Sequence, residues 1–386
     1  MRTAPYGFVL FLWRNPNSLF TVSGLYVAKE FDIEELNGDH GEGGSTRIRR
    51  SHSDRERKKT VKHREREVRD RLGEIANTIE GRITSTEGAY FVVHGADGND
   101  YKARTVKSTV SGNMMSTLAA VGDRVSIEHG EEAFAIIREV HPRKTKLSRK
   151  SHKRKAEFEQ VIAANVDRLL ITASVGEPPF YSHIVDRYLV AGLDGQLDVA
   201  IIVNKIDLLP TDKRAEEVEE KLAYYESIGY PVFRTSTEKG IGLEALRASL
   251  KGVTAVLAGR SGVGKSSLIN ALAGEELLRT SELTKKERRG KHTTTGAILL
   301  PLRGVENAFL VDTPGVREIF NYDLDPENLK FRYVDFLPYQ EHCKLTNCMH
   351  IHEPECAVAR AVEDGLIPEW RFTSYNVLYQ EATPRL

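Results

Sequence analysis

The fold is decided by the stretch Gly259-Arg260-Ser261-Gly262-Val263-Gly264-Lys265-Ser266. An apolar run at 254–258 precedes it, and a helical pattern at 267–272 follows it. A strand, a glycine-rich turn and a helix N-terminus form a phosphate-binding loop, in which backbone amides and the helix dipole face the phosphates. We predict that Lys265 reaches the β- and γ-phosphates and that the Ser266 hydroxyl ligates Mg²⁺. The predicted loop contacts are Gly259, Gly262, Val263, Gly264, Lys265, Ser266 and Ser267.

The bulk composition describes a globular chain of several domains. The 386 residues are 40% hydrophobic, which favours roughly two to four domains. The 55 basic residues balance the 55 acidic ones, so that any nucleic-acid surface must be local. The three cysteines all fall within 343–356, an odd and clustered count that favours a metal site in a reducing compartment over disulfides.

The first part of the chain resembles an appendage. Residues 1–75 contain a glycine-rich acidic segment at 38–44 and a dense run of charges at 47–71, and we expect a disordered extension. Its positive excess also suits contact with RNA phosphates, so both interpretations stay open. The apolar run at 6–13 is a weak candidate for a targeting segment; a mis-assigned start or a disordered extension is favoured. No apolar stretch reaches the ~18 residues that span a bilayer, so we expect no membrane contact.

Short alternating runs indicate a β-barrel at 76–145. About five strands are expected, at 82–84, 89–93, 100–104, 124–127 and 134–137, with glycines between them. This pattern fits a small OB-type barrel, which commonly binds oligonucleotides, although a β-domain with only a packing role remains the alternative. The basic stretch at 143–155 is either a plain linker or a contact with RNA phosphates.

An α/β domain is predicted at 146–320, with strand–helix alternation beginning near residue 165. Its expected strands lie at 168–173, 199–203, 232–235, 255–258, 297–300 and 308–311, and its expected helices at 184–193, 213–228 and 243–250. Beyond residue 320 the chain becomes irregular and then forms a mainly helical module at 321–386, with amphipathic segments at 357–363 and 375–380.

A guanine-reading motif follows the second predicted strand of this domain. Asp207 can accept hydrogen bonds from both the ring N–H and the exocyclic amine of guanine, a donor pair that adenine lacks. Asn204 would brace neighbouring loops, and the stem of Lys205 would lie against the base. Ser236, after the next strand, matches the loop that supports guanine through backbone contacts.

Two further segments fit the γ-phosphate side of a GTPase site. Asp312 ends an apolar strand and would hold Mg²⁺ through water, and the Gly315 amide would sense the γ-phosphate. The polar loop at 290–295 suits a mobile switch, in which we expect Thr294 to ligate Mg²⁺. The residue after Gly315 is Val316, where Ras-type enzymes carry a water-orienting glutamine, so we expect slow intrinsic hydrolysis.

The order of these motifs is permuted. Asn204 and Ser236 precede the loop that contains Lys265, and Asp312 follows it, whereas Ras-like GTPases begin with the phosphate-binding loop. We therefore predict a circularly permuted GTPase domain, which keeps the same sheet but is cut at a different loop.

Three thiols and an imidazole form a metal-ligand pattern near the C-terminus. Cys343, Cys348, His350 and Cys356 supply the closed tetrahedral set of a structural zinc site, one ion per chain. His342 and His352 lie nearby as spare ligands.

Together, the permuted motifs, the preceding barrel and the Cys-x4-Cys-x-His-x5-Cys module resemble the ribosome small-subunit-dependent GTPase A family (RsgA, also called YjeQ). The match covers about 81–381 and includes the stretches 143–149, 290–295 and 352–358; residues 1–75 fall outside it. The resemblance implies a GTPase that binds the small ribosomal subunit and its rRNA late in assembly, near the decoding region. The subunit would stimulate hydrolysis, which would trigger departure. It also identifies Val316 as the family's hydrophobic replacement of glutamine and His292 as its switch histidine.

Three functional hypotheses follow. The leading one is an RNA-stimulated GTPase that binds GTP or GDP with Mg²⁺ and zinc, and that acts as a cytoplasmic monomer. In it, His292, Lys265 and Thr294 are the catalytic candidates, and His292 would orient the attacking water. The second is a nucleotide-gated RNA-binding module whose hydrolysis is incidental. The third, a membrane-anchored signalling GTPase, rests only on the apolar run at 6–13.

Overall fold

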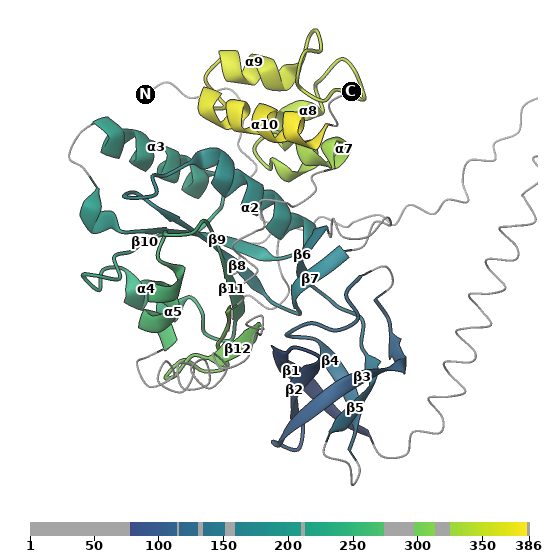
Figure 1. Cartoon of the computed structure of the whole chain (residues 1–386). Helices are drawn as coiled ribbons and strands as arrows, with labels where there is room; N and C mark the ends of the chain where they lie inside the picture. The colour runs from purple at the N-terminus through teal and green to yellow at the C-terminus, as the bar shows by residue number, and fades with distance from the viewer. Residues whose placement is uncertain are drawn as a thin grey trace, which may run out of the picture. The chain divides into compact units, whose positions relative to one another are not determined.

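A computed structural model describes residues 78–113, 116–129, 134–150, 159–209, 213–273, 297–312 and 325–383 (Figure 1). The chain divides into two compact units, Met1–Ala76 and Asn77–Leu386, and all described residues belong to the second. The predicted extension at 1–75 and the apolar run at 6–13 therefore lie outside the described residues. Among the helices that the structure describes, none is long and apolar enough to cross a membrane.

The N-terminal strands close into a five-stranded barrel, as predicted. They are β1 (Thr78–Glu87), β2 (Tyr90–Gly95), β3 (Asp100–Ser111), β4 (Arg124–Glu128) and β5 (Ala135–Val140). Their order is β1-β2-β3-β5-β4, and β4 pairs back with β1. Side chains that alternate along these strands fill the interior; Ile83, Val93, Val125, Ile127 and Ile137 are fully buried.

A hairpin connects the barrel to the next domain. Its strands, β6 (Lys146–Lys150) and β7 (Glu159–Ala164), pair antiparallel. The plain-linker interpretation of the basic stretch 143–155 is therefore wrong for Lys146–Lys150. Leu147 and Ala163 are buried in the main core, and this burial stabilises the two strands. The charged residues around Leu147 hide this strand in the sequence.

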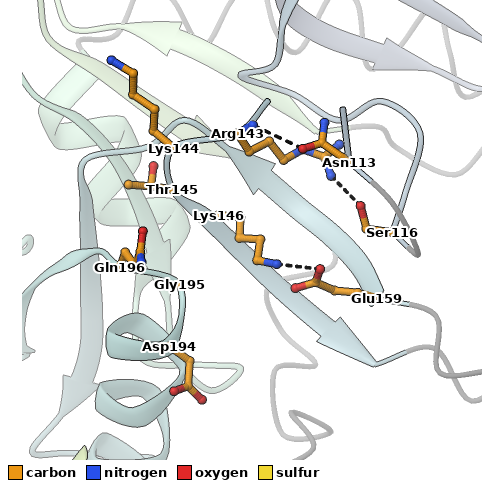
Figure 2. A pocket seen from close by; sticks show the side chains of 10 residues that line it. All are labelled: Asn113, Ser116, Arg143, Lys144, Thr145, Lys146, Glu159, Asp194, Gly195 and Gln196. Carbon is orange, nitrogen blue, oxygen red and sulfur yellow. Dashed lines mark hydrogen bonds and ion pairs between the residues drawn. The ribbon is translucent and has the colours of Figure 1, made fainter. Parts of the chain in front are cut away.

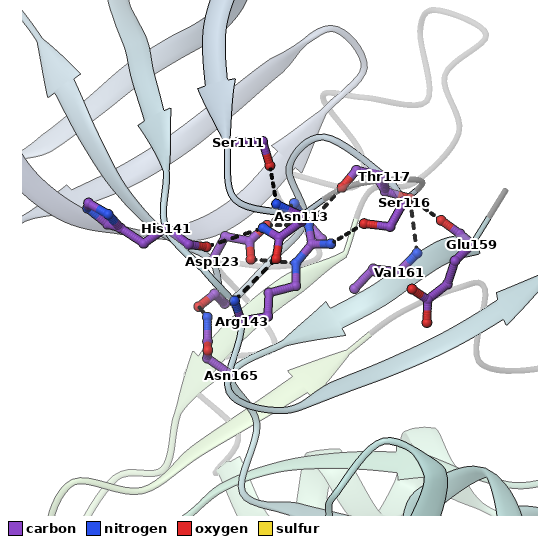
Figure 3. Close-up of polar contacts among 12 residues, drawn as sticks. Ser111, Asn113, Ser116, Thr117, Asp123, His141, Arg143, Glu159, Val161 and Asn165 are labelled. Atoms are coloured by element: carbon purple, nitrogen blue, oxygen red, sulfur yellow. Dashed lines mark hydrogen bonds and ion pairs between the residues drawn. The ribbon is translucent and has the colours of Figure 1, made fainter. Parts of the chain in front are cut away.

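A buried arginine in the segment between β5 and β6 binds the segment that joins β3 to β4 (Figure 3). Arg143 donates two hydrogen bonds to Asp123, from Nε to Oδ1 at 2.8 Å and from an Nη to Oδ2 at 2.7 Å. It also donates to the Ser116 hydroxyl at 3.0 Å and to the Thr117 carbonyl at 2.8 Å. The Arg143 and Asp123 side chains are 3% and 0% exposed, so this ion pair is buried and balanced.

A six-stranded sheet forms the centre of the predicted GTPase domain. Its strands are β8 (Arg168–Ser174), β9 (Asp198–Asn204), β10 (Val232–Arg234), β11 (Thr254–Ala258), β12 (Ile298–Pro301) and β13 (Phe309–Asp312), in the order β10-β9-β8-β11-β13-β12. All neighbours are parallel except β12, which pairs antiparallel with β13. All six predicted strands are present. One register pair, Ser85 with Ile298, also joins β12 to β1 of the barrel.

Helices cover both faces of the sheet, as a doubly wound fold requires (Figure 1). On one face, α2 (Ser182–Asp194) and α3 (Lys213–Ser227) pack over Leu169 and Ile171. On the other face, α4 (Leu243–Ala248) and α5 (Lys265–Ala273) pack over Leu170. Successive residues of β8 thus point to opposite faces, which explains its continuous apolar sequence.

The C-terminal module is mainly helical, as predicted. It contains α7 (Pro326–Leu329), η3 (Lys330–Arg332), α8 (Leu337–Gln340), α9 (Ala357–Glu363) and α10 (Glu369–Ala382). Its own small core includes Tyr333, Phe336, Val358, Tyr375 and Leu378. The last helix starts earlier than the amphipathic segment 375–380 indicates, and it packs along α2 of the GTPase domain (Figure 1).

Candidate functional site

The predicted motifs meet where the parallel strands end. Ser174 at the end of β8 pairs with Asn204 at the end of β9, and Ile171 pairs with Ala258 at the end of β11. On the other side of β11, Val256 pairs with Val311, so Asp312 follows at the same edge. The carboxyl edge of a parallel sheet is where such folds bind ligands.

Glycines are required in the phosphate-binding loop because its backbone is left-handed and crowded. Gly262 and Gly264 have φ of 86° and 98°. A Cβ on Gly264 would lie 2.3 Å from Nδ2 of Asn204, and one on Gly259 would lie 2.1 Å from the Thr172 carbonyl oxygen. Lys265 opens α5, and its ammonium donates to the Gly259 and Arg260 carbonyls at 2.6 Å each. Val263 is buried beneath the loop, whereas Ser266 and Ser267 are exposed.

Asn204 links the guanine motif to the phosphate-binding loop. This fully buried side chain donates from Nδ2 to the Val263 carbonyl at 3.1 Å. Its Oδ1 accepts from the Thr235 hydroxyl at 3.2 Å and from the Thr237 amide at 3.3 Å. One side chain therefore joins its own loop to the loops that contain Thr235 and Val263.

The rest of the guanine motif surrounds Asn204. Lys205 has a left-handed φ of 64°, and its Nζ donates to the Glu177 carbonyl at 2.6 Å. Asp207 lies exposed in the short helix η1 (Ile206–Leu208), where its carboxylate is accessible to a base. Ser236 is buried, and its hydroxyl accepts from the Lys239 amide at 3.1 Å.

The γ-phosphate side of the site is only partly described. Asp312 is half-buried at the end of β13. His292, Thr294 and Gly315 lie outside the described residues, as does Val316.

A loop that the sequence analysis did not select borders the same site. Residues 175–181 connect β8 to α2, and the Ser174 hydroxyl holds this loop through the Pro178 carbonyl at 2.5 Å. Pro178 lies next to Gly262, and the Arg260 guanidinium stands 5.2 Å from the centre of the Tyr181 ring. Pro178 and Pro179, shortly after a buried strand, were the available signal, because they indicate a rigid loop at the functional edge of the sheet.

The four predicted metal ligands come together in the C-terminal module. Their ligand atoms lie within 4.8 Å of one another. Nδ1 of His350 is 3.6 Å from Sγ of Cys343 and 3.4 Å from Sγ of Cys356, and the two Sγ atoms are 4.0 Å apart. Zinc–sulfur bonds of about 2.3 Å give ligand–ligand separations near 3.8 Å in a tetrahedron. The cluster is therefore compatible with zinc; His342 and His352 are exposed and are not members of it.

Burial of the cluster sets the protonation of its ligands. Burial lowers the pKa of His350 to about 4, so its imidazole is neutral and can donate a lone pair. Burial raises the pKa of Cys348 to about 12, and only a cation would compensate its thiolate there. Glu353 accepts the amides of Met349 at 2.7 Å and Ile351 at 2.8 Å, which fixes the ligand loop around His350.

A separate polar cavity of about 340 Å³ lies between the barrel, the hairpin and the end of α2 (Figure 2). Its two carboxylates are already paired. Glu159 accepts from Lys146 at 2.7 Å and from Ser148 at 2.6 Å, and Asp194 pairs with Arg332. These contacts make the cavity part of the joint between barrel and sheet, away from the nucleotide motifs.

The sequence model of the RsgA GTPase family matches residues 140–321. A small ribosomal subunit biogenesis GTPase from Chlorobaculum parvum is 42% identical over 308 residues, which cover 78% of this chain and 97% of that relative. The corresponding protein of Shewanella oneidensis is 38% identical over 77% of this chain and 81% of its own length.

Solved structures agree with these relatives. YjeQ from Thermotoga maritima is 30% identical, with a TM-score of 0.63 over 80% of this chain and all of that one. YloQ, described as a circularly permuted GTPase, is 26% identical, with a TM-score of 0.60 over 81% of this chain and 99% of its own. In this chain too, Asn204 precedes Lys265 although both lie at one sheet edge, which is a permuted order. This chain belongs to the RsgA GTPase family.

Proposed function

We propose that this protein hydrolyses GTP to GDP and phosphate during the biogenesis of the small ribosomal subunit. The observation that carries the proposal is the position of Asn204, whose side chain fastens the guanine motif to the phosphate-binding loop at 3.1 Å. The names of the relatives supply the process. We infer that the subunit and its rRNA stimulate hydrolysis, and that hydrolysis drives release.

Base selection is assigned to the guanine motif. Asp207 would accept hydrogen bonds from guanine, the Lys205 stem would lie along the base, and the Ser236 loop would support it with backbone groups. The exposure of Asp207 and the buried, hydrogen-bonded side chain of Asn204 support this assignment. ATP lacks the donor pair and would be rejected.

Phosphate binding is assigned to the glycine-rich loop. Gly259, Gly262, Val263, Gly264, Ser266 and Ser267 would surround the phosphates, and Lys265 would exchange its two carbonyl partners for β- and γ-phosphate oxygens. Ser266, Thr294 and Asp312 would hold Mg²⁺, which neutralises phosphate charge, and the Gly315 amide would sense the γ-phosphate.

For the catalytic group we propose His292, in the switch segment at 290–295. Val316 cannot hydrogen-bond water, whereas an imidazole can orient it. Supplying such a group when the partner binds is worth about 10³-fold or more in related enzymes.

For the C-terminal module we propose one structural zinc per chain, held by Cys343, Cys348, His350 and Cys356. The ligand separations and the neutral, buried His350 support this assignment. We also expect the protein to act as a monomer, and its proposed partner would place it in the cytoplasm.

GTP turnover with and without purified small ribosomal subunits tests the proposal, with large subunits as the matched control. We expect strong stimulation by small subunits alone. His292→Ala should keep GTP binding and co-sedimentation with the subunit but lose most of the stimulation. Co-sedimentation without stimulation of the unaltered protein would contradict the proposal and favour an RNA-binding module with incidental hydrolysis. Full stimulation of His292→Ala would leave the catalytic group to the ribosome.

A further inference from the structure

Arg371 of α10 is a fully buried cation that ties the C-terminal module to the GTPase domain. Its side chain is 1% exposed, and it donates to both oxygens of Asp335, at 3.0 and 2.9 Å. A third donor binds Asp186 of α2, which is 0% exposed. Tyr333 stacks beneath the guanidinium, with its ring centre 4.1 Å away. Two buried carboxylates from separate segments thus depend on one cation.

The Asp186 end of this contact is close to the nucleotide site. Asp186 also accepts from Tyr225 of α3 at 2.6 Å, so its position in the sheet-covering layer is fixed. Two residues further along α2, about 3 Å along the helix axis, Tyr188 faces the phosphate-binding loop. Tyr188 and Ile184 line a small cavity of about 20 Å³ together with Arg260 and Val263 of that loop. Little free space therefore remains between α2 and the loop. A shift of α2 would change its packing against Arg260 and Val263.

The Arg371 end of the contact is close to the cysteine–histidine cluster. Tyr375 is one turn after Arg371 on the same face of α10. Its hydroxyl donates to the Met349 carbonyl, beside the ligand His350, at 2.6 Å. Lys330 adds a bond to the carbonyl of the ligand Cys348 at 2.9 Å. The ligand loop and α10 therefore form one packed unit.

We propose that Arg371 is a positioning residue that couples metal binding at the Cys343–Cys348–His350–Cys356 cluster to guanine-nucleotide binding, by holding α2 against the phosphate-binding loop. The inference rests on the proposed nucleotide site. Loss of the metal frees the ligand loop, α10 loosens at Tyr375, and Asp186 loses its buried partner. The N-terminal half of α2 then no longer supports Val263 and Arg260 from below.

Such a link is reciprocal. A metal that strengthens nucleotide binding must itself be bound more tightly when nucleotide is present, by the same factor. Couplings between distant sites commonly amount to roughly 5- to 150-fold. A contact that merely stabilises the fold changes affinity or stability but produces no such matched pair of changes.

The test measures the affinity of the full-length chain for a fluorescent GDP analogue, before and after a chelator removes the metal. Metal release is followed in parallel, with and without saturating GDP. We expect removal of the metal to weaken GDP binding at least 5-fold, and GDP to tighten metal retention by the same factor. In the triple variant Arg371→Met, Asp186→Asn, Asp335→Asn, which leaves no buried charge unpaired, both effects should vanish.

Arg332→Met is the matched control, because Arg332 binds Asp194 at the far end of α2 and should leave the coupling intact. If the triple variant does not fold, Arg371→Lys, which cannot bind Asp335 with two parallel bonds, should reduce the coupling instead. An unaltered protein that binds GDP equally well with and without metal would overturn the inference, as would a coupling unchanged by the Arg371 variants. A protein that binds no GDP at all would overturn the proposed function instead.

Discussion

Two buried arginines lie where the GTPase domain meets its neighbours, and they differ in the charges around them and in the elements that they connect. Arg143 pairs with one carboxylate, Asp123, so the barrel joint is neutral. Arg371 stands between two acidic side chains, Asp186 and Asp335, so the C-terminal joint has two carboxyl groups for one cation. Arg143 binds Thr117, which in turn pairs with Glu159 of the β6–β7 hairpin, whereas the Arg371 joint ends on α2, which borders the phosphate-binding loop. We infer that the Arg143 joint only holds the barrel in place. The Arg371 joint can also transmit a change from the metal cluster to the phosphate-binding loop.

The largest expected effect separates the two joints by their dependence on metal. Zinc binding contributes on the order of 10 kcal/mol to folding of such small modules, so chelation should unfold α9 and α10 and leave the barrel intact. Hydrogen exchange would measure this as lost protection in α9 and α10 with unchanged protection in β1–β5. Elemental analysis should find about one zinc per chain, kept in His352→Ala and lost in Cys348→Ser. Zinc-free protein prepared without chelator, with the same exchange pattern, would refute the metal site.

The next effect concerns the neutral joint. Arg143→Met leaves Asp123 buried without its partner, which typically costs about 3–5 kcal/mol. We expect faster hydrogen exchange throughout β1–β5, partly restored when Asp123→Asn is added, and no change in GDP affinity. If Arg143→Met also lost the dependence of GDP affinity on the metal, as we expect of the Arg371 variants, the distinction between the two joints would be removed.

Lys265→Ala should affect chemistry without affecting either joint. Loss of a cation aimed at the transferred phosphoryl group lowers kcat by about 10²–10³-fold. The fold should persist, because the Lys265 ammonium donates to the Gly259 and Arg260 carbonyls of its own loop. Lys251→Ala, which breaks an exposed pair with Glu306, is the control and should turn over GTP normally. Unaltered turnover in Lys265→Ala would remove this residue from the mechanism.

The smallest expected effect is at the rim of the barrel joint. The Lys146–Glu159 pair is 39% and 29% exposed, and such pairs are worth about 0–1 kcal/mol. Lys146→Ala should therefore change the melting temperature much less than Arg143→Met, although the two residues line the same cavity (Figure 2). A loss as large as that of Arg143→Met would show that burial does not determine the strength of these joints.

The sequence predicted those parts of the molecule whose signals are local. The barrel strands alternate, the sheet strands are continuous apolar runs, and Gly259–Ser266 and the cysteine cluster each fall within a short stretch. The hairpin strand at Lys146–Lys150 was missed because a single buried leucine, Leu147, is its only apolar residue.

The Arg371 joint could not be predicted from one sequence. Arg371 lies 36 residues from Asp335 and 185 residues from Asp186. Each of the three is a charged residue of a type that is usually exposed. Only the packing of α10 on α2 buries them together. The same holds for the loop at 175–181, whose contacts with Lys205 and Arg260 depend on the sheet order.

The central claim is that the edge of this sheet binds and hydrolyses guanine nucleotides, and replacement of Asp207 tests it most directly. The measurement is small-subunit-stimulated turnover of GTP and of xanthosine triphosphate by the unaltered protein and by Asp207→Asn. The amide can donate to the extra carbonyl of xanthine but cannot accept both guanine protons. We predict that GTP turnover at limiting nucleotide falls by about 10²-fold or more and that turnover of xanthosine triphosphate rises. Unchanged GTP turnover in the variant would contradict the account.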